Sequence, residues 1–521
     1  MTANLSRRDL VTRGGAGALA LALGTGALPT ERSYARPRID GDVYGLGVAS
    51  GDPTPDGVVL WTRLAPKPIE PDGLGGMPPG RVAVRWQVAE DPRFRRVVRR
   101  GRVTASPELA FAVHPEVHGL RPGREYYYRF EAAGQISPVG RTRTAPAHEV
   151  REVALGLVGC QSFGAGYYTA YRHLAAEDLD FVLHTGDYLY ESGFPNGARG
   201  EDLPDWMAGE TLDLTRYHTQ YGLYKADPDL RTAHATHPFV VYWDDHEVEN
   251  NYASLIPQGD ADAPTFARRR AEAYQAYYEH QPLRLAQRPH RGGLQLYRRL
   301  EWGRMLGLNV LDGRQHRSDQ VPPDQVAAPD RTMLGARQER WVERSLQRSC
   351  TRWNLLGNQT VMSWVDNDTG PGVSQPNDNW NGYHAARDRL LGAVADMRAR
   401  NVVVVTGDAH CSMAGDLRRK VEDFESSPVV GAEFLGTSIS SGGDGEPLLP
   451  KGRTWLTSNP DMKFFDGRRG YVRLAMNRRE LTTTYKALEY VTRPGAPIQT
   501  IAQLTVLDGV PGVQGGRITL V

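Results

Sequence analysis

Cysteine, net charge and long apolar runs are all scarce in this sequence. Three cysteines among 521 residues exclude a fold that depends on a disulfide framework. The 62 basic and 61 acidic side chains give a formal net charge of +1, which excludes a global field that favours nucleic acid or an anionic membrane. Cys350 and Cys411 have no ligand spacing, and the sequence leaves open whether they are buried thiols or a disulfide bridge.

The one long apolar run lies at the N-terminus and predicts an export signal. Arg7 and Arg8 precede a stretch rich in Ala, Leu and Gly, and a small-x-small pattern ends at Ala35. Residues 1–35 therefore read as a twin-arginine signal peptide, which requires the Tat export machinery as a partner. The run is shorter than the roughly 20 residues of a membrane span, so we expect no stable membrane anchor. The expected location is secreted or extracytoplasmic: periplasm, cell wall or extracellular medium.

The pattern of apolar and polar residues changes near residue 146, which predicts two domains. Between residues 40 and 146, short alternating runs separated by Pro and Gly are typical of a β-sandwich. Residues 120–130 resemble the fibronectin type III pattern, in which a turn leads into a strand that carries a corner tyrosine. In residues 150–510, strands alternate with helical patterns, which predicts βαβ units and a mainly parallel sheet. Two of the helical patterns, 266–279 and 336–347, are highly charged and predict solvated faces.

Polar clusters follow four short apolar runs, at residues 154–158, 181–183, 239–243 and 402–405. Each run is typical of a buried strand, and ligands of an open α/β sheet bind where strands end. Any one cluster could arise by chance, but four at strand ends predict one shared site. The clusters are Gly159-Cys160-Gln161-Ser162, Gly186-Asp187-Tyr188-Leu189-Tyr190, Asp244-Asp245-His246-Glu247 and Gly407-Asp408-Ala409-His410.

The side chains of these clusters predict a site for two metals. Asp187 offers two carboxylate oxygens and is the candidate to bridge two cations. Tyr190, three residues later, becomes a ligand only on a strongly polarising metal, because its free pKa is near 10, and this favours trivalent iron. Cys160 as a thiolate and His410 as a neutral imidazole would complete a mixed O, S and N shell around that metal.

The second metal position is expected to be rich in oxygen. Asp245 and Asp408, together with Asp187 and Asn358, would supply carboxylate and amide oxygens. Such a shell favours Ca²⁺, Mg²⁺ or Mn²⁺ over zinc.

These motifs resemble those of the calcineurin-like metallophosphoesterase superfamily and, within it, the PhoD-type alkaline phosphatases and phosphodiesterases. Gly-Asp-x-x-Tyr at residues 186–190 is similar to the motif of iron-tyrosinate phosphatases. Residues 245–247 stand where the superfamily has Asn-His-Asp/Glu, and residues 407–410 stand where it has Gly-His-x-His. The resemblance covers nearly the whole chain, since the stretches 47–53, 243–251 and 379–383 are also similar to the PhoD branch.

The departures from the superfamily pattern, Cys160 in the first motif and Asp408 in place of a histidine, are those of the PhoD branch. The resemblance implies one Fe³⁺ with Ca²⁺ as its partner, with the number of Ca²⁺ ions left open, and secretion by the twin-arginine route. It also implies an α/β fold class: a metallophosphoesterase-like β-sheet core flanked by helices and preceded by a fibronectin III-like β-sandwich.

In the expected mechanism a metal-activated hydroxide attacks phosphorus in line with the leaving alkoxide. His246, beside the proposed ligand Asp245, is the candidate to stabilise charge or to protonate the leaving group. Arg314, after a predicted strand, is a weaker candidate to bind a phosphate oxygen, because nothing in the sequence sets its direction.

The expected function is secreted, metal-dependent hydrolysis of phosphate monoesters, an alkaline phosphatase activity. A phosphodiesterase or phospholipase D-like hydrolase would use the same metals, so small phosphate esters, a phospholipid and a polymeric phosphodiester all stay open as substrates. Two alternatives of another class are a non-catalytic exported protein that binds the cell wall and an iron redox enzyme. A structural metal site gives no reason for Asp-His-Glu at a strand end, and the acid-rich second shell argues against redox chemistry.

Overall fold

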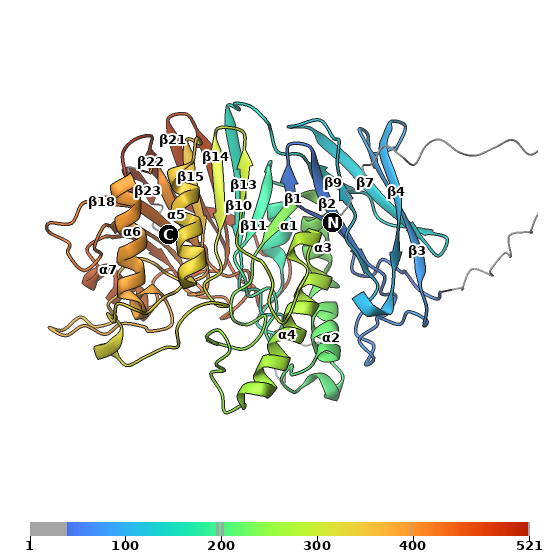
Figure 1. Cartoon of the computed structure of the whole chain (residues 1–521), viewed down its shortest axis with the longest axis horizontal. Coiled ribbons are helices and arrows are strands. Elements are labelled where there is room, and N and C mark those ends of the chain that lie inside the picture. The colour runs from blue at the N-terminus through green and yellow to red at the C-terminus, as the bar shows by residue number, and fades with distance from the viewer. Residues whose placement is uncertain (1–38, 194–196, 200–202, 398, 519–521) are drawn as a thin grey trace, which may run out of the picture. The chain divides into compact units, whose positions relative to one another are not determined.

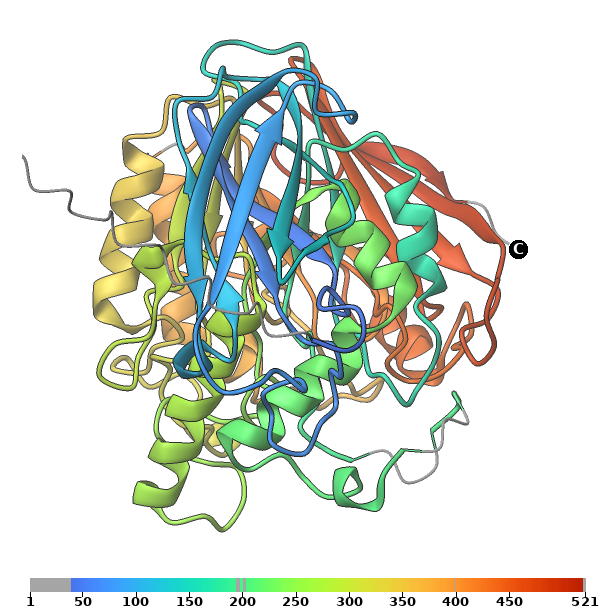
Figure 2. The same cartoon turned by 90° about the vertical axis from the view of Figure 1, so that its right-hand side faces the viewer.

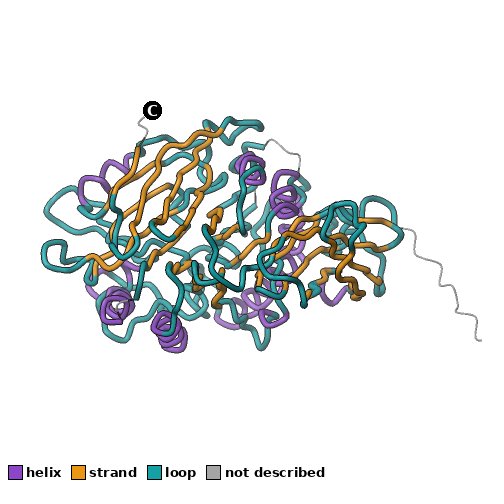
Figure 3. Tube along the Cα trace, turned by 90° about the horizontal axis from the view of Figure 1, so that it is seen from above, coloured by secondary structure: helices purple, strands orange, loops and turns teal. Residues whose placement is uncertain are grey.

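The computed structural model describes residues 39–193, 197–199, 203–397 and 399–518, so the signal peptide expected at residues 1–35 lies outside the described residues. Two large sheets and one smaller sheet form this part of the chain (Figure 1). Helices flank the strands, as the purple and orange segments of Figure 3 show. Within the described ranges, no helix is long and apolar enough to cross a membrane.

The first large sheet has eleven strands, of which four central ones pair in parallel. Its order is β23-β22-β21-β20-β10-β11-β12-β1-β2-β5, with β6 paired to β2. The strands on both sides of the parallel centre are antiparallel. Their bounds are Val48–Thr54 (β1), Gly57–Arg63 (β2), Ala112–Val113 (β5), Glu116–Val117 (β6), Glu152–Val158 (β10), Phe181–His184 (β11), Pro238–Val241 (β12), Gly470–Asn477 (β20), Glu480–Leu488 (β21), Ile498–Leu507 (β22) and Gly515–Ile518 (β23).

The second large sheet has seven strands in the order β13-β14-β15-β16-β18-β17-β19. Its centre, from β14 to β18, is again parallel, and its outer strands are antiparallel. The bounds are Arg298–Trp302 (β13), Leu306–Val310 (β14), Trp353–Gly357 (β15), Val402–Thr406 (β16), Ser412–Arg418 (β17), Val429–Leu435 (β18) and Met462–Asp466 (β19).

The valines of β16 show why its apolar run is continuous. Val403 and Val405 belong to the core cluster that both large sheets share, whereas Val402 and Val404 belong to the cluster with α5 and α6. Alternate side chains of a strand point to opposite faces, so a strand buried on both faces needs no polar residue. Figure 1 shows α5 and α6 side by side. The helices are Thr169–Ala175 (α1), Leu214–Lys225 (α2), Pro228–Thr236 (α3), Ala263–His280 (α4), Gly335–Gln347 (α5), His384–Met397 (α6) and Pro450–Ser458 (α7).

The expected N-terminal β-sandwich is present. Its five-stranded sheet, blue and facing the viewer in Figure 2, shares a hydrophobic core with β1 and β2. The corner tyrosine is Tyr126, whose hydroxyl accepts a hydrogen bond of 2.9 Å from the backbone N–H of Arg121. Because β1 pairs with β12, the sandwich and the rest of the chain share one sheet. The five strands are Val82–Ala89 (β3), Val97–Ala105 (β4), Glu125–Ala132 (β7), Gln135–Ile136 (β8) and Gly140–Arg143 (β9).

Two expectations about the fold were wrong. A single, mainly parallel sheet is replaced by two mixed sheets, because β17 and β19 to β23 return antiparallel at the edges. The charged helix α4 is not simply a solvated face: Arg269 and Arg270 are buried, and Arg269 pairs with Glu249 at 2.6 Å. The question left open for Cys350 and Cys411 is also answered, since both thiols are free.

Candidate metal centre

The four polar clusters meet where their strands end, although they come from two sheets. Cys160 follows β10, Asp187 follows β11 and Asp245 follows β12, whereas Asp408 and His410 follow β16 of the second sheet. Hydrogen bonds join the first two loops directly. The backbone N–H of Cys160 donates to the carbonyl oxygen of Gly186 at 3.0 Å, and that of Gln161 donates to Asp187 at 3.0 Å.

Four of the expected ligands have left-handed backbone conformations. The φ angles are 54° at Cys160, 52° at Asp187, 70° at Asp408 and 53° at His410. A non-glycine residue in this region costs free energy, and such residues cluster where the surrounding structure holds a functional group in place. The sharp turns aim these side chains back toward one another.

Gly186, directly before Asp187, permits the close approach of two of the loops. Its φ is +103°, and a Cβ atom there would lie 2.3 Å from the backbone nitrogen of Asp244. Only glycine combines that backbone conformation with that contact. The close contact between the two loops therefore requires the glycine of the Gly-Asp-x-x-Tyr motif.

The donor atoms form three overlapping groups. Cys160, Asp187 and His410 make one group, Asp187, Asp245 and His246 a second, and Asp244, Asp245 and Asp408 a third, each with its donor atoms within 4.8 Å of one another. Asp187 joins the first group to the second.

Tyr190 lies against the first group. Its hydroxyl donates to Oδ2 of Asp187 at 3.1 Å, lies 2.9 Å from Nε2 of His410, and accepts a bond of 2.8 Å from Ser441. The structure thus brings together six residues that the sequence suggested as ligands: Cys160, Asp187, Tyr190, Asp245, Asp408 and His410.

The buried donors fit a bound cation. Oδ1 of Asp187 and Oδ2 of Asp244 are buried and have no hydrogen-bond partner among the described residues. Burial, followed by nearby carboxylates, raises the pKa of the Cys160 thiol, and burial is also the main cause of the raised pKa values of Tyr190 and Asp187. A cation stabilises the ionised form of each group, because its charge replaces the lost hydration.

His410 has the protonation state that a metal ligand needs. Burial, assisted by the positive charge of Arg469, lowers its pKa to about 3, so the imidazole is neutral at physiological pH. The combination of thiol, phenol, imidazole and carboxylate suits a transition metal at the first group, and the three carboxylates of the third group suit a hard cation.

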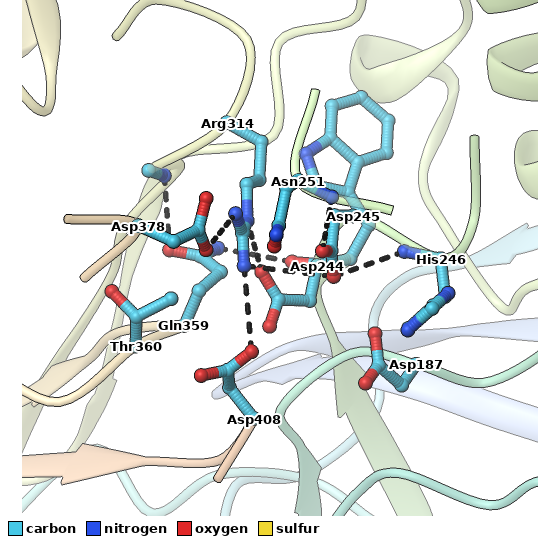
Figure 4. A network of polar contacts seen from close by, with 12 residues as sticks. Asp187, Asp244, Asp245, His246, Asn251, Arg314, Gln359, Thr360, Asp378 and Asp408 are labelled. Carbon is cyan, nitrogen blue, oxygen red and sulfur yellow. Dashed lines mark hydrogen bonds and ion pairs between the residues drawn. The ribbon is translucent and has the colours of Figure 1, made fainter. Parts of the chain in front are cut away.

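Arg314 has a different setting from the one that we expected. Its side chain is fully buried, and Figure 4 shows it among the carboxylates of Asp244, Asp378 and Asp408. Its Nε donates to Asp244, its Nη1 donates to Asp378 at 2.7 Å, and its Nη2 lies 3.5 Å from Asp245 and 3.6 Å from Asp408. The guanidinium partly neutralises a cluster of acids that would otherwise repel one another.

Asn358 is also engaged differently. Its Oδ1 accepts from the indole of Trp380 at 3.2 Å, and its Nδ2 donates to the carbonyl oxygen of Thr360 at 2.5 Å. The amide thus fixes the loop after β15, and we do not include it among the metal ligands proposed below.

His246 is held by a residue that sequence reasoning missed. Its Nδ1 lies 2.8 Å from Oε2 of Glu191, whose other oxygen accepts the backbone N–H of Asn250 at 2.9 Å. The imidazole also packs on the ring of Tyr190, with centroids 4.1 Å apart. Burial opposes protonation of His246, but the charges of Asp245 and Asp187 and the contact with Glu191 outweigh burial and raise its pKa well above the usual value.

Glu247, in the third cluster, is a second residue whose role was missed. Its carboxylate accepts backbone N–H groups from Asp187 at 3.0 Å, Tyr188 at 2.7 Å and Asp244 at 2.9 Å. One buried side chain thereby ties the loop after β11 to the loop after β12. Sequence position offered a signal in both cases, since Glu191 follows Tyr190 directly and Glu247 follows His246.

Comparison with known proteins identifies the family of the chain. The PhoD-like phosphatase family matches residues 155–485, and the family described as PhoD-like phosphatase, N-terminal domain, matches residues 30–146. Alkaline phosphatase D of Bacillus subtilis (strain 168) is 43% identical over 493 residues, which cover 92% of this chain and 83% of the relative. A solved structure titled "Structure of PhoD" is 42% identical, has a TM-score of 0.88, and is matched over 93% of this chain and 94% of its own. The chain therefore belongs to the PhoD-like phosphatase family.

Proposed function

We propose that this protein is a secreted, metal-dependent phosphoesterase that hydrolyses phosphate monoesters. Membership of the PhoD-like phosphatase family supports a phosphatase. The observation that carries the proposal is the position of Asp187, whose carboxylate belongs to two donor groups with different chemistry. A shared carboxylate between two cations is the arrangement that two-metal phosphoesterases need.

We assign Cys160, Asp187, Tyr190 and His410 as the ligands of Fe³⁺. We assign Asp187, Asp245 and Asp408, with Asp244 added from the structure, as the ligands of Ca²⁺. When bound, these cations supply Lewis-acid polarisation of the phosphoryl oxygens and of a water molecule.

The chain's own residues then have four tasks. His246 delivers a proton to the leaving oxygen, and Glu191 holds Nδ1 of that imidazole so that the other nitrogen is left for the substrate. Arg314 balances the charge of the acids around it, and Glu247 keeps the two loops in register. Each task uses a contact within the described residues.

The metal assignment is tested by elemental analysis and a visible spectrum of the protein as isolated. Phenolate or thiolate bound to Fe³⁺ absorbs visible light, so we expect a coloured protein that contains iron and calcium. Tyr190→Phe should shift or remove the absorption band, whereas Tyr167→Phe, a tyrosine outside the site, should leave it unchanged. A colourless zinc protein with full activity would refute the assignment of Tyr190 and Cys160.

Preference for a monoester is tested by comparing an aryl phosphate with the corresponding bis-aryl phosphate. We expect the higher kcat/KM for the monoester. A higher value for the diester would make the protein a phosphodiesterase with the same metals.

We also propose that the signal peptide spans residues 1–35, the sandwich domain residues 40–146 and the catalytic domain residues 150–510, and that the mature protein is exported. N-terminal sequencing of the exported protein should start after Ala35. Replacement of Arg7 and Arg8 by lysine should leave the protein inside the cell, and export that persists would argue against the twin-arginine route.

A further inference from the structure

A cavity with a volume of about 650 Å³ lies next to the segment that carries Arg314, because Gln315 and Ser254 are among its lining residues. Its floor includes the buried side chains of Leu294, Tyr297 and Leu334. Four exposed basic or imidazole side chains also line it: Arg288, His290, His316 and Arg337. None of the residues assigned above to the metal shells lines this cavity.

The charge of the cavity has one sign. No aspartate or glutamate is among its lining residues, and no carboxylate of the described residues pairs with Arg288 or Arg337. Neighbouring arginines differ, because Arg284 pairs with Glu116 at 3.0 Å and Arg298 with Asp52 at 2.7 Å. Two unpaired guanidiniums around one concave space concentrate positive potential there and attract an anion.

The start of α5 adds to this potential. Ala336 and Arg337, in the first turn of the helix, line the cavity, whereas the N–H of Gly335, the first residue of the helix, already donates to Oγ1 of Thr332 at 2.8 Å. The first N–H groups of a helix carry partial positive charge and lack partners within the helix. Together with the arginines they offer both charge and donors, which is the combination that binds a phosphate group.

The cavity borders the segment that carries Arg314. Gln315 lines the cavity and directly follows Arg314, whose guanidinium contacts the acids of the metal centre. Ser254, another lining residue, donates its backbone N–H to the carbonyl oxygen of Arg314 at 3.0 Å. The side chain of Gln315 bonds to the backbone of Leu294 and to the carboxylate of Asp312, and these bonds fix its position in the lining.

We propose that this cavity binds a phosphate group at a second site, distinct from the metal centre. The phosphate has two sources with the same chemistry: free inorganic phosphate, or a second phosphate on an ester whose first phosphate reaches the metals. The second source rests on the proposed phosphoesterase function, whereas the first does not.

The test uses the metal-loaded enzyme and the double variant Arg288→Ala/Arg337→Ala. Both side chains are exposed, so the variant should fold, and circular dichroism checks this. Arg340→Ala is the matched control, because Arg340 is exposed on the same helix but does not line the cavity. Calorimetric titration with inorganic phosphate counts the sites, and KM is compared between monoalkyl phosphates and alkanediol bisphosphates of increasing length.

We expect two phosphate sites in the wild type and in Arg340→Ala, and one in the double variant. If a substrate supplies the phosphate, KM for a bisphosphate of suitable length rises roughly tenfold or more in the double variant, the span for losing hydrogen bonds to a charged group, while kcat/KM for monophosphates stays the same. If the double variant loses one phosphate site but keeps the wild-type KM for monophosphates and for bisphosphates, the ligand is free phosphate. Equal site counts and equal KM values in the wild type and the double variant would overturn the proposal. If the wild type binds two phosphates but hydrolyses none of these esters, the phosphoesterase function is refuted and the second phosphate site is not.

Discussion

Mutation of His246 and Glu191 can test proton transfer separately from metal binding. If His246 protonates the leaving oxygen, His246→Ala should lower kcat by roughly 10² to 10⁴, the span for losing a general acid. Glu191→Gln keeps the shape of the side chain but removes its charge from the 2.8 Å contact with Nδ1. A hydrogen bond to a charged group contributes about 1.5–3 kcal/mol, which corresponds to a fall in kcat of roughly ten- to a hundredfold.

The leaving group provides the assay. A nitrophenolate leaves without help, because it is a weak base, whereas an alkoxide needs a proton in the transition state. We therefore expect His246→Ala to reduce kcat far more for an alkyl phosphate than for 4-nitrophenyl phosphate. Glu191→Gln should follow the same trend with a smaller effect.

Metal content decides what a negative result means. A nitrogen of His246 lies within 4.8 Å of donor atoms of Asp187 and Asp245, so the imidazole could instead be a ligand. Loss of metal from His246→Ala, measured by elemental analysis, would assign His246 to the shell. An equal loss of kcat for both leaving groups with full metal content would refute the role of general acid.

Three further predictions concern the metals and the fold. Chelation should abolish hydrolysis while far-UV circular dichroism stays native, and retained activity would argue against a metal-dependent enzyme. Arg314→Met should destabilise the protein by about 3–5 kcal/mol, since it leaves Asp244 and its neighbours without their buried counter-charge. Added Ca²⁺ should raise the Tm of this variant more than that of the wild type. If the Tm of the variant equals that of the wild type, the acids need no guanidinium. Tyr126→Phe should lower the stability by about 1 kcal/mol in chemical denaturation, because the N–H of Arg121 loses its partner, and no change would mean that water replaces the hydroxyl.

The strands and the corner tyrosine could be predicted because their signals are local. The run at residues 402–405 is apolar since β16 is buried on both faces, and that requirement is written in consecutive residues. The turn before Tyr126 and the hydroxyl that it needs lie five residues apart. The α/β fold class and the sandwich followed from such short patterns.

The arrangement of the sheets could not be predicted, because it depends on pairing between distant strands. β10 pairs with β20 more than 300 residues later, and no local pattern records this partner. Convergence of the four clusters was expected at the edge of one sheet, whereas β16 approaches from the other. The clusters still converge, because both sheets present the ends of their parallel strands to the same region.

Arg314 illustrates the same limit for single side chains. An arginine after a strand is equally compatible with a phosphate ligand and with a buried ion pair until its neighbours are known. Those neighbours, Asp244 and Asp378, are 70 and 64 residues away in sequence. Residue type alone therefore could not show that this guanidinium is buried among carboxylates.

The contacts of Glu247 bear on how the metal centre is formed. Its carboxylate binds three N–H groups on two loops, and one of them belongs to Asp187, a proposed ligand in a left-handed conformation. Strain of this kind persists only where other contacts enforce it. These contacts lie within the protein, so they help to hold the loop after β11 against the loop after β12 beside the proposed metal ligands. Because such contacts and the two large sheets do not depend on metal ligands, we expect chelation to remove activity and to leave the secondary structure intact.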